Sequence, residues 1–222
     1  MRRHRSLSAT AFFIITAIVA AHSRSNAQDK AVNVMVEINN ATTSAPRVQP
    51  VAQKLVEQAI QDAISIVSTN NSCGSFYGQT KATEEVLRRL ATQFQVRLLG
   101  DSRTGIEMSG SFTYFDQKEE VRYRLFAAAT INSRGPFLKA KVFAAEPHVP
   151  PVGGFRPNTR EARVLMLLHE VAHLVKGADG DWLIPDDGNA PALSRRNTAL
   201  VESKCRAQIL LLSQTAQAVA GK

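Results

Sequence analysis

The chain has 222 residues, 44% of them hydrophobic and 21% charged, which is enough to fold around an apolar core of its own. Its formal net charge is +8, but the lysines and arginines are scattered, and few aromatic residues lie among them. This composition is not that of a nucleic-acid-binding protein. The mild basicity gives only a weak preference for acidic surfaces.

The first residues are typical of a signal peptide. Three arginines precede an apolar stretch, 11–21, and Ser25-Asn26-Ala27 places small residues at the spacing of a cleavage site. The apolar stretch is too short to span a membrane with these flanks. We expect residues 1–27 to be removed and the protein to be secreted or periplasmic, with no later membrane contact; an uncleaved N-terminal anchor is the alternative. Cleavage would remove four arginines and no acids, lowering the net charge from +8 to +4.

Two helices are predicted in the first third of the remaining chain. Residues 28–48 are polar and read as an extended lead-in. Apolar residues recur at helical spacing over 51–67. A polar segment, 69–74, interrupts that helix, and 83–90 reads as a second, short helix.

The middle of the chain changes to the period of a β-strand. Apolar and polar residues alternate over 106–115 and over 121–131, with Phe126 the exception, and a polar turn, 116–118, separates the two runs. This pattern predicts an antiparallel hairpin. We expect a third strand over 138–145.

Two helices are predicted in the last third. A loop with four prolines, 146–157, precedes a helix that begins at a cap near Thr159 and runs to Lys176, before Gly177. After a loop rich in Asp and Gly, a last helix is expected over 194–219. Asn197 could cap this last helix or hydrogen-bond a metal ligand, and capping is the favoured role.

The motif with the clearest chemistry is His169-Glu170-Val171-Ala172-His173, inside the first of these two helices. Histidines at i and i+4 lie on one helix face, so both imidazoles can bind one Zn²⁺, and the intervening Glu170 can act as general base on a water at the open position. Apolar residues surround the motif in sequence, which predicts a buried helix. Buried His and Glu side chains are costly without partners, and a metal would satisfy them.

A catalytic zinc site needs a third protein ligand. The metzincin pattern HExxHxxGxxH is absent, because Lys176 stands in place of its glycine and Asp179 in place of its third histidine. The remaining candidates are carboxylates downstream of the motif and one histidine upstream: Asp179, Asp181, Asp186, Asp187, Glu202 and His148.

A family resemblance narrows this choice. The HExxH helix, the Asp-Asp-Gly loop at 186–188 and the helix segment Asn197-Thr198…Cys205 resemble the C-terminal part of small secreted bacterial HExxH proteins of the zincin-like metallopeptidase type. Cys73-Gly74-x-Phe76 resembles the upstream cysteine segment of the same group. The resemblance implies Asp187 as the third ligand, with Glu202, Asp181 and Asp186 as alternatives.

The order of predicted elements also resembles a compact zincin domain, in which a sheet lies over the HExxH helix. The fold class expected for residues 28–222 is therefore α+β and zincin-like, one domain with a small antiparallel sheet packed on helices. The segment 137–143 is a candidate edge strand for pairing with an extended peptide, although an ordinary strand is equally consistent. Tyr114, Tyr123 and His148 are candidate hydrogen-bond donors to the reacting carbonyl, with none preferred.

Two cysteines, Cys73 and Cys205, lie far apart in the chain. In an oxidising compartment they are a candidate disulfide, with two buried free thiols as the alternative. Metal ligation by them is disfavoured, since no second cysteine lies near either.

These features predict an exported zinc peptidase with a peptide or protein substrate. The alternatives are, second, a secreted binding or structural domain that kept the zinc helix but lacks turnover and, third, zinc-dependent hydrolysis of a non-peptide amide. The sequence leaves the oligomeric state open.

Overall fold

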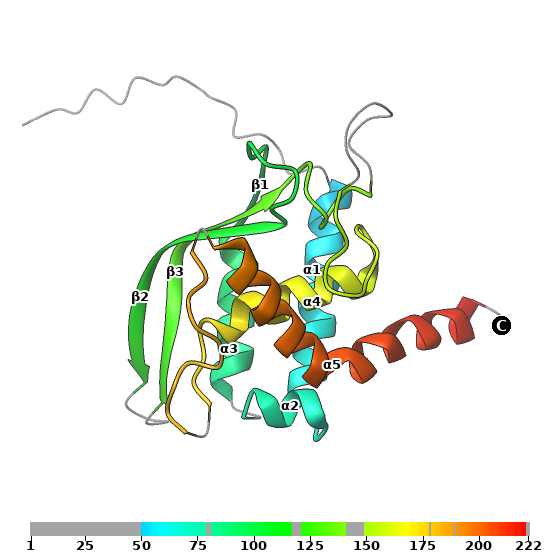
Figure 1. Ribbon diagram of the computed structural model, residues 1–222. Helices are drawn as coiled ribbons and strands as arrows, with labels where there is room; N and C mark the ends of the chain where they lie inside the picture. The colour runs from blue at the N-terminus through cyan, green and yellow to red at the C-terminus, as the bar shows by residue number, and fades with distance from the viewer. Residues whose placement is uncertain are drawn as a thin grey trace, which may run out of the picture. The chain divides into compact units, whose positions relative to one another are not determined.

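Five helices and a three-stranded sheet make up the part of the chain that the computed structural model describes, residues 50–78, 81–116, 121–140, 149–177, 179–188 and 190–220 (Figure 1). All of these residues belong to one compact unit, Ser44–Lys222. The expected signal peptide, 1–27, and the lead-in, 28–48, lie outside the described residues. In chain order the elements are α1 (Pro50–Val67), α2 (Ser72–Phe76), α3 (Lys81–Gln93), β1 (Phe94–Arg97), β2 (Ile106–Asp116), β3 (Val121–Asn132), α4 (Arg160–Ala172) and α5 (Pro191–Ala220).

The sheet has the strand order β1-β3-β2. The predicted hairpin is confirmed, because β2 and β3 pair antiparallel from Ile106 opposite Ile131 to Asp116 opposite Val121. The expectation of a purely antiparallel sheet is wrong, since β1 runs parallel to β3. β1 follows α3 without a loop, and Gln93 at the end of α3 donates a hydrogen bond to the Phe126 carbonyl of β3 at 2.7 Å. The chain is therefore already next to β3 where α3 ends and β1 begins.

The third strand predicted over 138–145 is not seen where the structure describes this range. Leu138 and Lys139 both donate backbone hydrogen bonds to the Gly135 carbonyl, at 3.1 and 3.0 Å, which makes a turn, and 141–145 lies outside the described residues. Phe137 lies within this turn and is fully buried. The first residues of the candidate peptide-binding edge, 137–143, are therefore part of the core and a turn rather than of a strand.

Three helices, α2, α3 and α5, differ from the predicted ones. The polar segment after α1 does end that helix, but it also starts α2: the Asn71 side chain accepts a hydrogen bond from the Gly74 N–H at 2.8 Å. α5 begins at Pro191, three residues earlier than expected. Proline suits the first turn of a helix, where its missing N–H would have no helical acceptor. α3 is also longer than the predicted helix at 83–90.

α4, the helix of the HExxH motif, is buried along most of its length and packs between α1 and α5 (Figure 1). Its predicted cap is confirmed, with the Thr159 hydroxyl accepting from the Ala162 N–H at 3.2 Å. The helix ends at Ala172 rather than at Lys176, and His173 is its C-terminal cap. Backbone bonds from His173 to Glu170 and from Leu174 to Val171 tighten this last turn. The chain therefore turns away directly after the second histidine of the motif.

A bidentate ion pair joins the helices at the start of α4. The Arg160 guanidinium contacts the buried Asp62 carboxylate of α1 at 2.6 and 2.7 Å and donates to the Leu212 carbonyl of α5 at 3.0 Å. Bidentate pairing fixes both the distance and the orientation of the two side chains.

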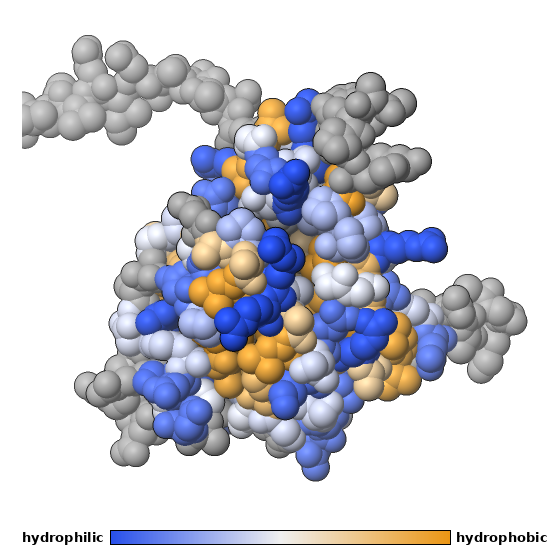
Figure 2. Space-filling view, viewed as in Figure 1, coloured by the Kyte–Doolittle hydropathy of each residue, from blue (hydrophilic) through white to orange (hydrophobic). Residues whose placement is uncertain are grey.

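Figure 2 shows hydrophobic surface along α5, whose large exposed apolar residues are Leu200, Leu210 and Leu211. None of the described helices combines the length and the apolar character needed to cross a membrane.

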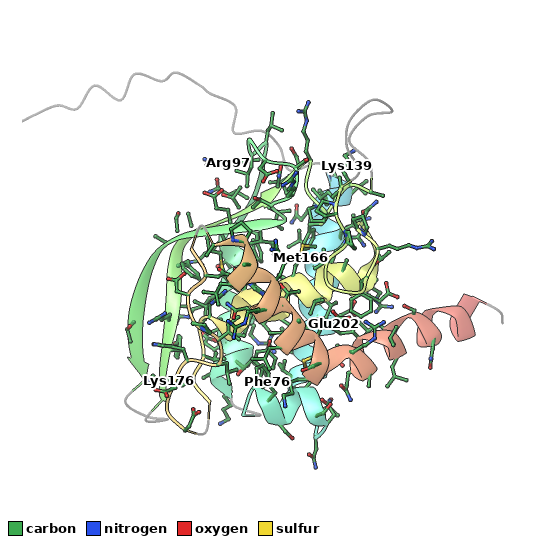
Figure 3. All side chains as sticks on the ribbon, viewed as in Figure 1. Phe76, Arg97, Lys139, Met166, Lys176 and Glu202 are labelled. Atoms are coloured by element: carbon green, nitrogen blue, oxygen red, sulfur yellow. A yellow bond between two sulfur atoms is a disulfide. The ribbon has the colours of Figure 1, made fainter. Side chains whose placement is uncertain are left out.

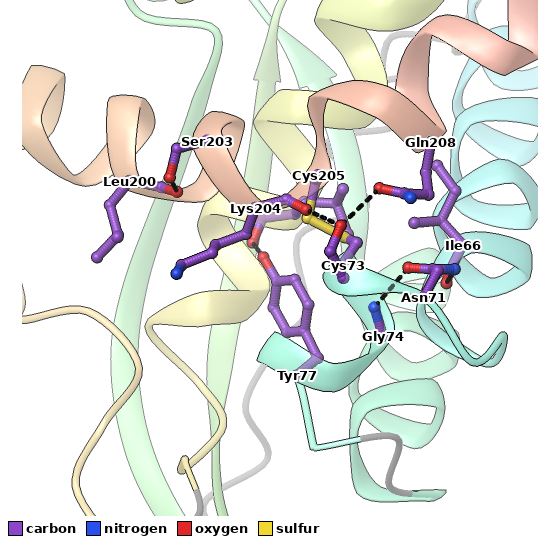
Figure 4. The surroundings of a disulfide bond; sticks show 12 residues. Ile66, Asn71, Cys73, Gly74, Tyr77, Leu200, Ser203, Lys204, Cys205 and Gln208 are labelled. Atoms are coloured by element: carbon purple, nitrogen blue, oxygen red, sulfur yellow. Dashed lines mark hydrogen bonds between the residues drawn. A yellow bond between two sulfur atoms is a disulfide. The ribbon is translucent and has the colours of Figure 1, made fainter.

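The predicted disulfide is confirmed: Cys73 of α2 and Cys205 of α5 are joined, with their Cα atoms 4.4 Å apart (Figure 4). A hydrogen bond at 2.7 Å from the Ser72 hydroxyl to the Lys204 carbonyl lies beside it. At the end of α2, the buried Tyr77 hydroxyl donates to the Leu168 carbonyl of α4. Burial raises the pKa of Tyr77 well above its usual value, so this phenol stays protonated and can donate.

Candidate metal centre

Three candidate ligands meet at the end of α4. The Nε2 atoms of His169 and His173 are 3.2 Å apart. The Asp187 carboxylate, from the loop before α5, lies with Oδ2 3.3 Å from His169 Nε2 and Oδ1 3.5 Å from His173 Nε2. Both histidines are buried and Asp187 is partly buried. Among the described residues, this is the one place where three or more metal-ligating side chains gather.

The loop that carries Asp187 is folded back against the end of α4 by backbone hydrogen bonds. The Ile184 N–H donates to the Ala172 carbonyl at 3.3 Å, and the Leu183 N–H donates to the Val175 carbonyl at 3.2 Å. Buried Ile184 anchors this return in the core. Asp187 therefore comes beside the histidines although it lies 14 residues after His173 in the sequence.

Asn197 does not cap α5, because the helix begins at Pro191. Its buried side-chain amide instead donates to the Pro185 carbonyl at 2.9 Å. This bond fixes the loop at Pro185, two residues before Asp187. The predicted capping role is wrong, and the side chain supports the carboxylate without contacting a candidate ligand directly.

The electrostatics of the site keep His169 neutral and Asp187 ionised. Burial lowers the pKa of His169, with the Asp187 carboxylate acting in the opposite direction. Burial alone would raise the pKa of Asp187, but the two imidazoles against its oxygens outweigh burial and hold it well below its usual range. Neutral imidazole and carboxylate are the forms that bind a metal ion.

Glu170, the candidate general base, is partly buried beside this cluster. Burial raises the pKa of its carboxyl to about 8, and the negative charges of Asp187 and Asp186 add to the rise. A cation placed among the three candidate ligands would favour the ionised form of Glu170. The side chain therefore has the proton affinity of a group that exchanges protons near neutral pH.

One hydroxyl group that the sequence did not indicate also reaches the site. Thr198 of α5 lies with its Oγ1 3.1 Å from His169 Nδ1, the ring nitrogen opposite the one that faces Asp187. The resemblance drew attention to the Asn197-Thr198 pair but gave Thr198 no role. No local pattern could have done so, because the contact joins two helices whose crossing is set by the fold.

The neighbouring acidic residues have other partners. Asp179 Oδ1 accepts from the Asp181 N–H at 3.0 Å, and Asp186 Oδ1 accepts from the Gly188 N–H at 3.1 Å. Asp179, Asp181 and Asp186 are all exposed. These short-range bonds are typical of turns in Asp- and Gly-rich loops.

Glu202, the other alternative as third ligand, is engaged away from the histidines. Its carboxylate accepts from the Gly154 N–H at 3.0 and 3.2 Å and forms an ion pair with Arg206. The Arg206 guanidinium in turn lies over the Phe155 ring, 5.0 Å from its centre. Figure 3 labels Glu202 on α5 near the loop that precedes α4. Glu202 therefore fixes that loop to α5.

This role predicts a stability defect for Gly153→Ala. Gly153 has φ of +55°, and an added Cβ would lie 2.1 Å from Glu202 Oε2. Gly180 has φ of +83° with nothing within 4 Å of the same position, so Gly180→Ala is a matched control for the backbone strain alone. We expect Gly180→Ala to cost about 1 kcal/mol and Gly153→Ala to cost at least about 1 kcal/mol more, measured by urea denaturation. Equal losses of stability in the two variants would show that the Glu202 side chain moves aside without a measurable cost.

The three candidate donors to a reacting carbonyl receive no support. Tyr123 is buried in the hydrophobic core. Tyr114 lies opposite it in the β2–β3 ladder, and nothing further is described for its side chain. His148 lies outside the described residues.

The geometry of the cluster fits zinc. Zinc–nitrogen bonds of about 2.05 Å at a tetrahedral angle place two ligand nitrogens about 3.3 Å apart, and a carboxylate oxygen about the same distance from each. The two Nε2 atoms are 3.2 Å apart, and they lie 3.3 and 3.5 Å from different oxygens of the Asp187 carboxylate, so the distances between the three groups are close to this spacing. In addition, Asp187 Oδ2 is buried and makes no hydrogen bond to any described residue. A buried carboxylate oxygen in that state is stabilised by a cation.

No protein-family model, curated protein or solved structure matches this chain. The resemblance to small secreted HExxH proteins therefore stays a prediction made from the residues. Function has to be inferred from the chemistry of His169, Glu170, His173 and Asp187.

Proposed function

We propose that this protein is an exported zinc-dependent peptidase of the zincin type, with zinc held by His169, His173 and Asp187. The observation that carries the proposal is that His169 Nε2, His173 Nε2 and the Asp187 carboxylate lie 3.2 to 3.5 Å from one another, close to the spacing of ligands around one tetrahedral zinc ion. Three protein ligands leave the fourth position for water or substrate, as catalytic zinc sites require.

The fold is consistent with this class. The HExxH helix is buried between helices, the sheet belongs to the same compact unit, and the third ligand comes from a later segment. The disulfide suits an oxidising compartment outside the cytoplasm. The substrate class that we propose is a peptide or protein.

When bound, zinc would supply Lewis acidity, which makes water a nucleophile near neutral pH and polarises a carbonyl group. Glu170 would accept the proton of the attacking water on its carboxylate and pass it to the amine nitrogen that leaves. His169 remains neutral, and Asp187 contributes the negative charge of the ligand set. Asn197 holds the Asp187 loop in place through the Pro185 carbonyl.

Zinc analysis of the purified protein tests the site. We expect about one zinc per chain in the wild type, and its loss in His169→Ala and Asp187→Asn. Asp186→Asn, one residue away on an exposed turn, is the matched control and should keep zinc, as should Glu202→Ala, since Glu202 is bonded to Gly154. Elemental analysis after dialysis gives the stoichiometry. A folded wild-type protein without zinc would end the proposal.

A further inference from the structure

The hydroxyl of Thr198 has a fixed direction in this structure. Its Oγ1 lies 2.9 Å from the Ser194 carbonyl oxygen and 3.1 Å from His169 Nδ1. A carbonyl oxygen can only accept a hydrogen bond, and a hydroxyl has one hydrogen to donate. The hydrogen is therefore used on Ser194, and the Thr198 oxygen is left as an acceptor towards His169.

This direction determines the tautomer of His169. An acceptor at 3.1 Å from Nδ1 requires the proton of the neutral ring to be on Nδ1, so Nε2 carries a lone pair. That lone pair faces Asp187 Oδ2 at 3.3 Å. Asp187 Oδ2 has no hydrogen-bond donor among the described residues. A cation between Nε2 and this oxygen would be bound by both atoms.

The two histidines differ in the hydrogen-bond partner of their Nδ1 atoms. His173 Nδ1 is buried and has no hydrogen-bond partner among the described residues. Only His169 has its outer nitrogen held by a side chain from another helix. Outer partners of ligating histidines fix the ring orientation and raise ligand basicity, and their loss commonly weakens metal binding by about 10–100-fold.

We propose that Thr198 is a positioning residue of the metal centre: it accepts the Nδ1 proton of His169 and so presents Nε2 of that ring, unprotonated, to the metal. This inference rests on the proposed zinc site, which it deepens. Thr198 itself touches neither the metal position nor a substrate. It acts through His169 alone.

The first test is zinc affinity, measured on the full protein by competition with a chromophoric chelator. Thr198→Val keeps the shape of the side chain and removes the acceptor, and we expect zinc binding to weaken about 10–100-fold. Thr198→Ser restores the hydroxyl and should bind zinc as the wild type does. Thr92→Val is the matched control, since the Thr92 hydroxyl also bonds a carbonyl of its own helix, that of Arg89, but lies in α3. It should leave the affinity unchanged. Wild-type affinity in Thr198→Val would overturn the proposal.

The second test needs no variant and is independent of zinc. Nitrogen-15 NMR of the metal-free wild-type protein reports which ring nitrogen of His169 carries the proton. We expect a proton on Nδ1 and none on Nε2; the reverse would overturn the role of Thr198 even if zinc binds. A protein that shows the Nδ1–H tautomer but takes up no zinc would disprove the proposed function and leave the Thr198–His169 contact established.

Discussion

Glu170→Gln is expected to lower the rate of peptide cleavage by about 10²–10⁴-fold while leaving zinc bound. Glutamine has nearly the shape of glutamate but cannot take a proton from water. Glu170 is not one of the three clustered ligands, so its loss should not release the metal. Cleavage of a peptide library, read by mass spectrometry and paired with zinc analysis of the same samples, measures both effects.

Glu161→Gln is the matched control for this change. Glu161 lies in the first turn of the same helix and accepts a hydrogen bond from Ser213, which a glutamine can also accept. The Glu161→Gln variant should cleave peptides at the wild-type rate. Zinc-loaded wild-type protein that cleaves no peptide would favour the non-catalytic zinc-binding alternative, and undiminished cleavage by Glu170→Gln would remove Glu170 from the mechanism.

Removing the disulfide is expected to cost about 4 kcal/mol of stability, because Cys73 and Cys205 are 132 residues apart and close a long loop. For a protein of this size, that loss corresponds to a decrease in Tm of about 8–16 °C. The double variant Cys73→Ala/Cys205→Ala, compared with the wild type by thermal denaturation, measures it.

Reductant supplies the control. Dithiothreitol should lower the Tm of the wild-type protein to near that of the double variant and leave the double variant unchanged. Equal Tm values for the wild type with and without reductant, in a sample whose free thiols confirm reduction, would show that packing around α2 and α5 is sufficient without the covalent bond.

Some local signals predicted their elements correctly. Alternation over β2 and β3 and the cap at Thr159 are local signals, and all three features are present. β1 has four residues, too few for a periodic pattern, and its place beside β3 depends on the packing of α3. The end of α4 was misplaced because Lys176 pairs with Trp182 in an isolated bridge, a contact between segments that no helix signal records.

The same distinction between local signals and contacts set by the tertiary fold applies to the candidate site. Spacing alone put His169 and His173 on one face of one helix. Asp187 was chosen by resemblance, since Asp179, Asp181 and Asp186 offer the same carboxylate within a few residues. What distinguishes Asp187 is the pairing of its loop with the end of α4, which depends on the tertiary fold. Thr198 depends on the crossing of α4 and α5 and has no signal in the sequence.

The two helices that the disulfide joins, or residues next to them, contact the stretch of α4 that carries the candidate zinc site. Tyr77, at the end of α2, bonds the Leu168 carbonyl, and Thr198 of α5 contacts the next residue, His169. The disulfide joins α2 to α5, so it restrains the positions of both segments that contact α4 there. Linkage between two such equilibria is reciprocal. If zinc binds at the candidate site and the closed disulfide tightens this binding by some factor, bound zinc protects the disulfide from reduction by the same factor.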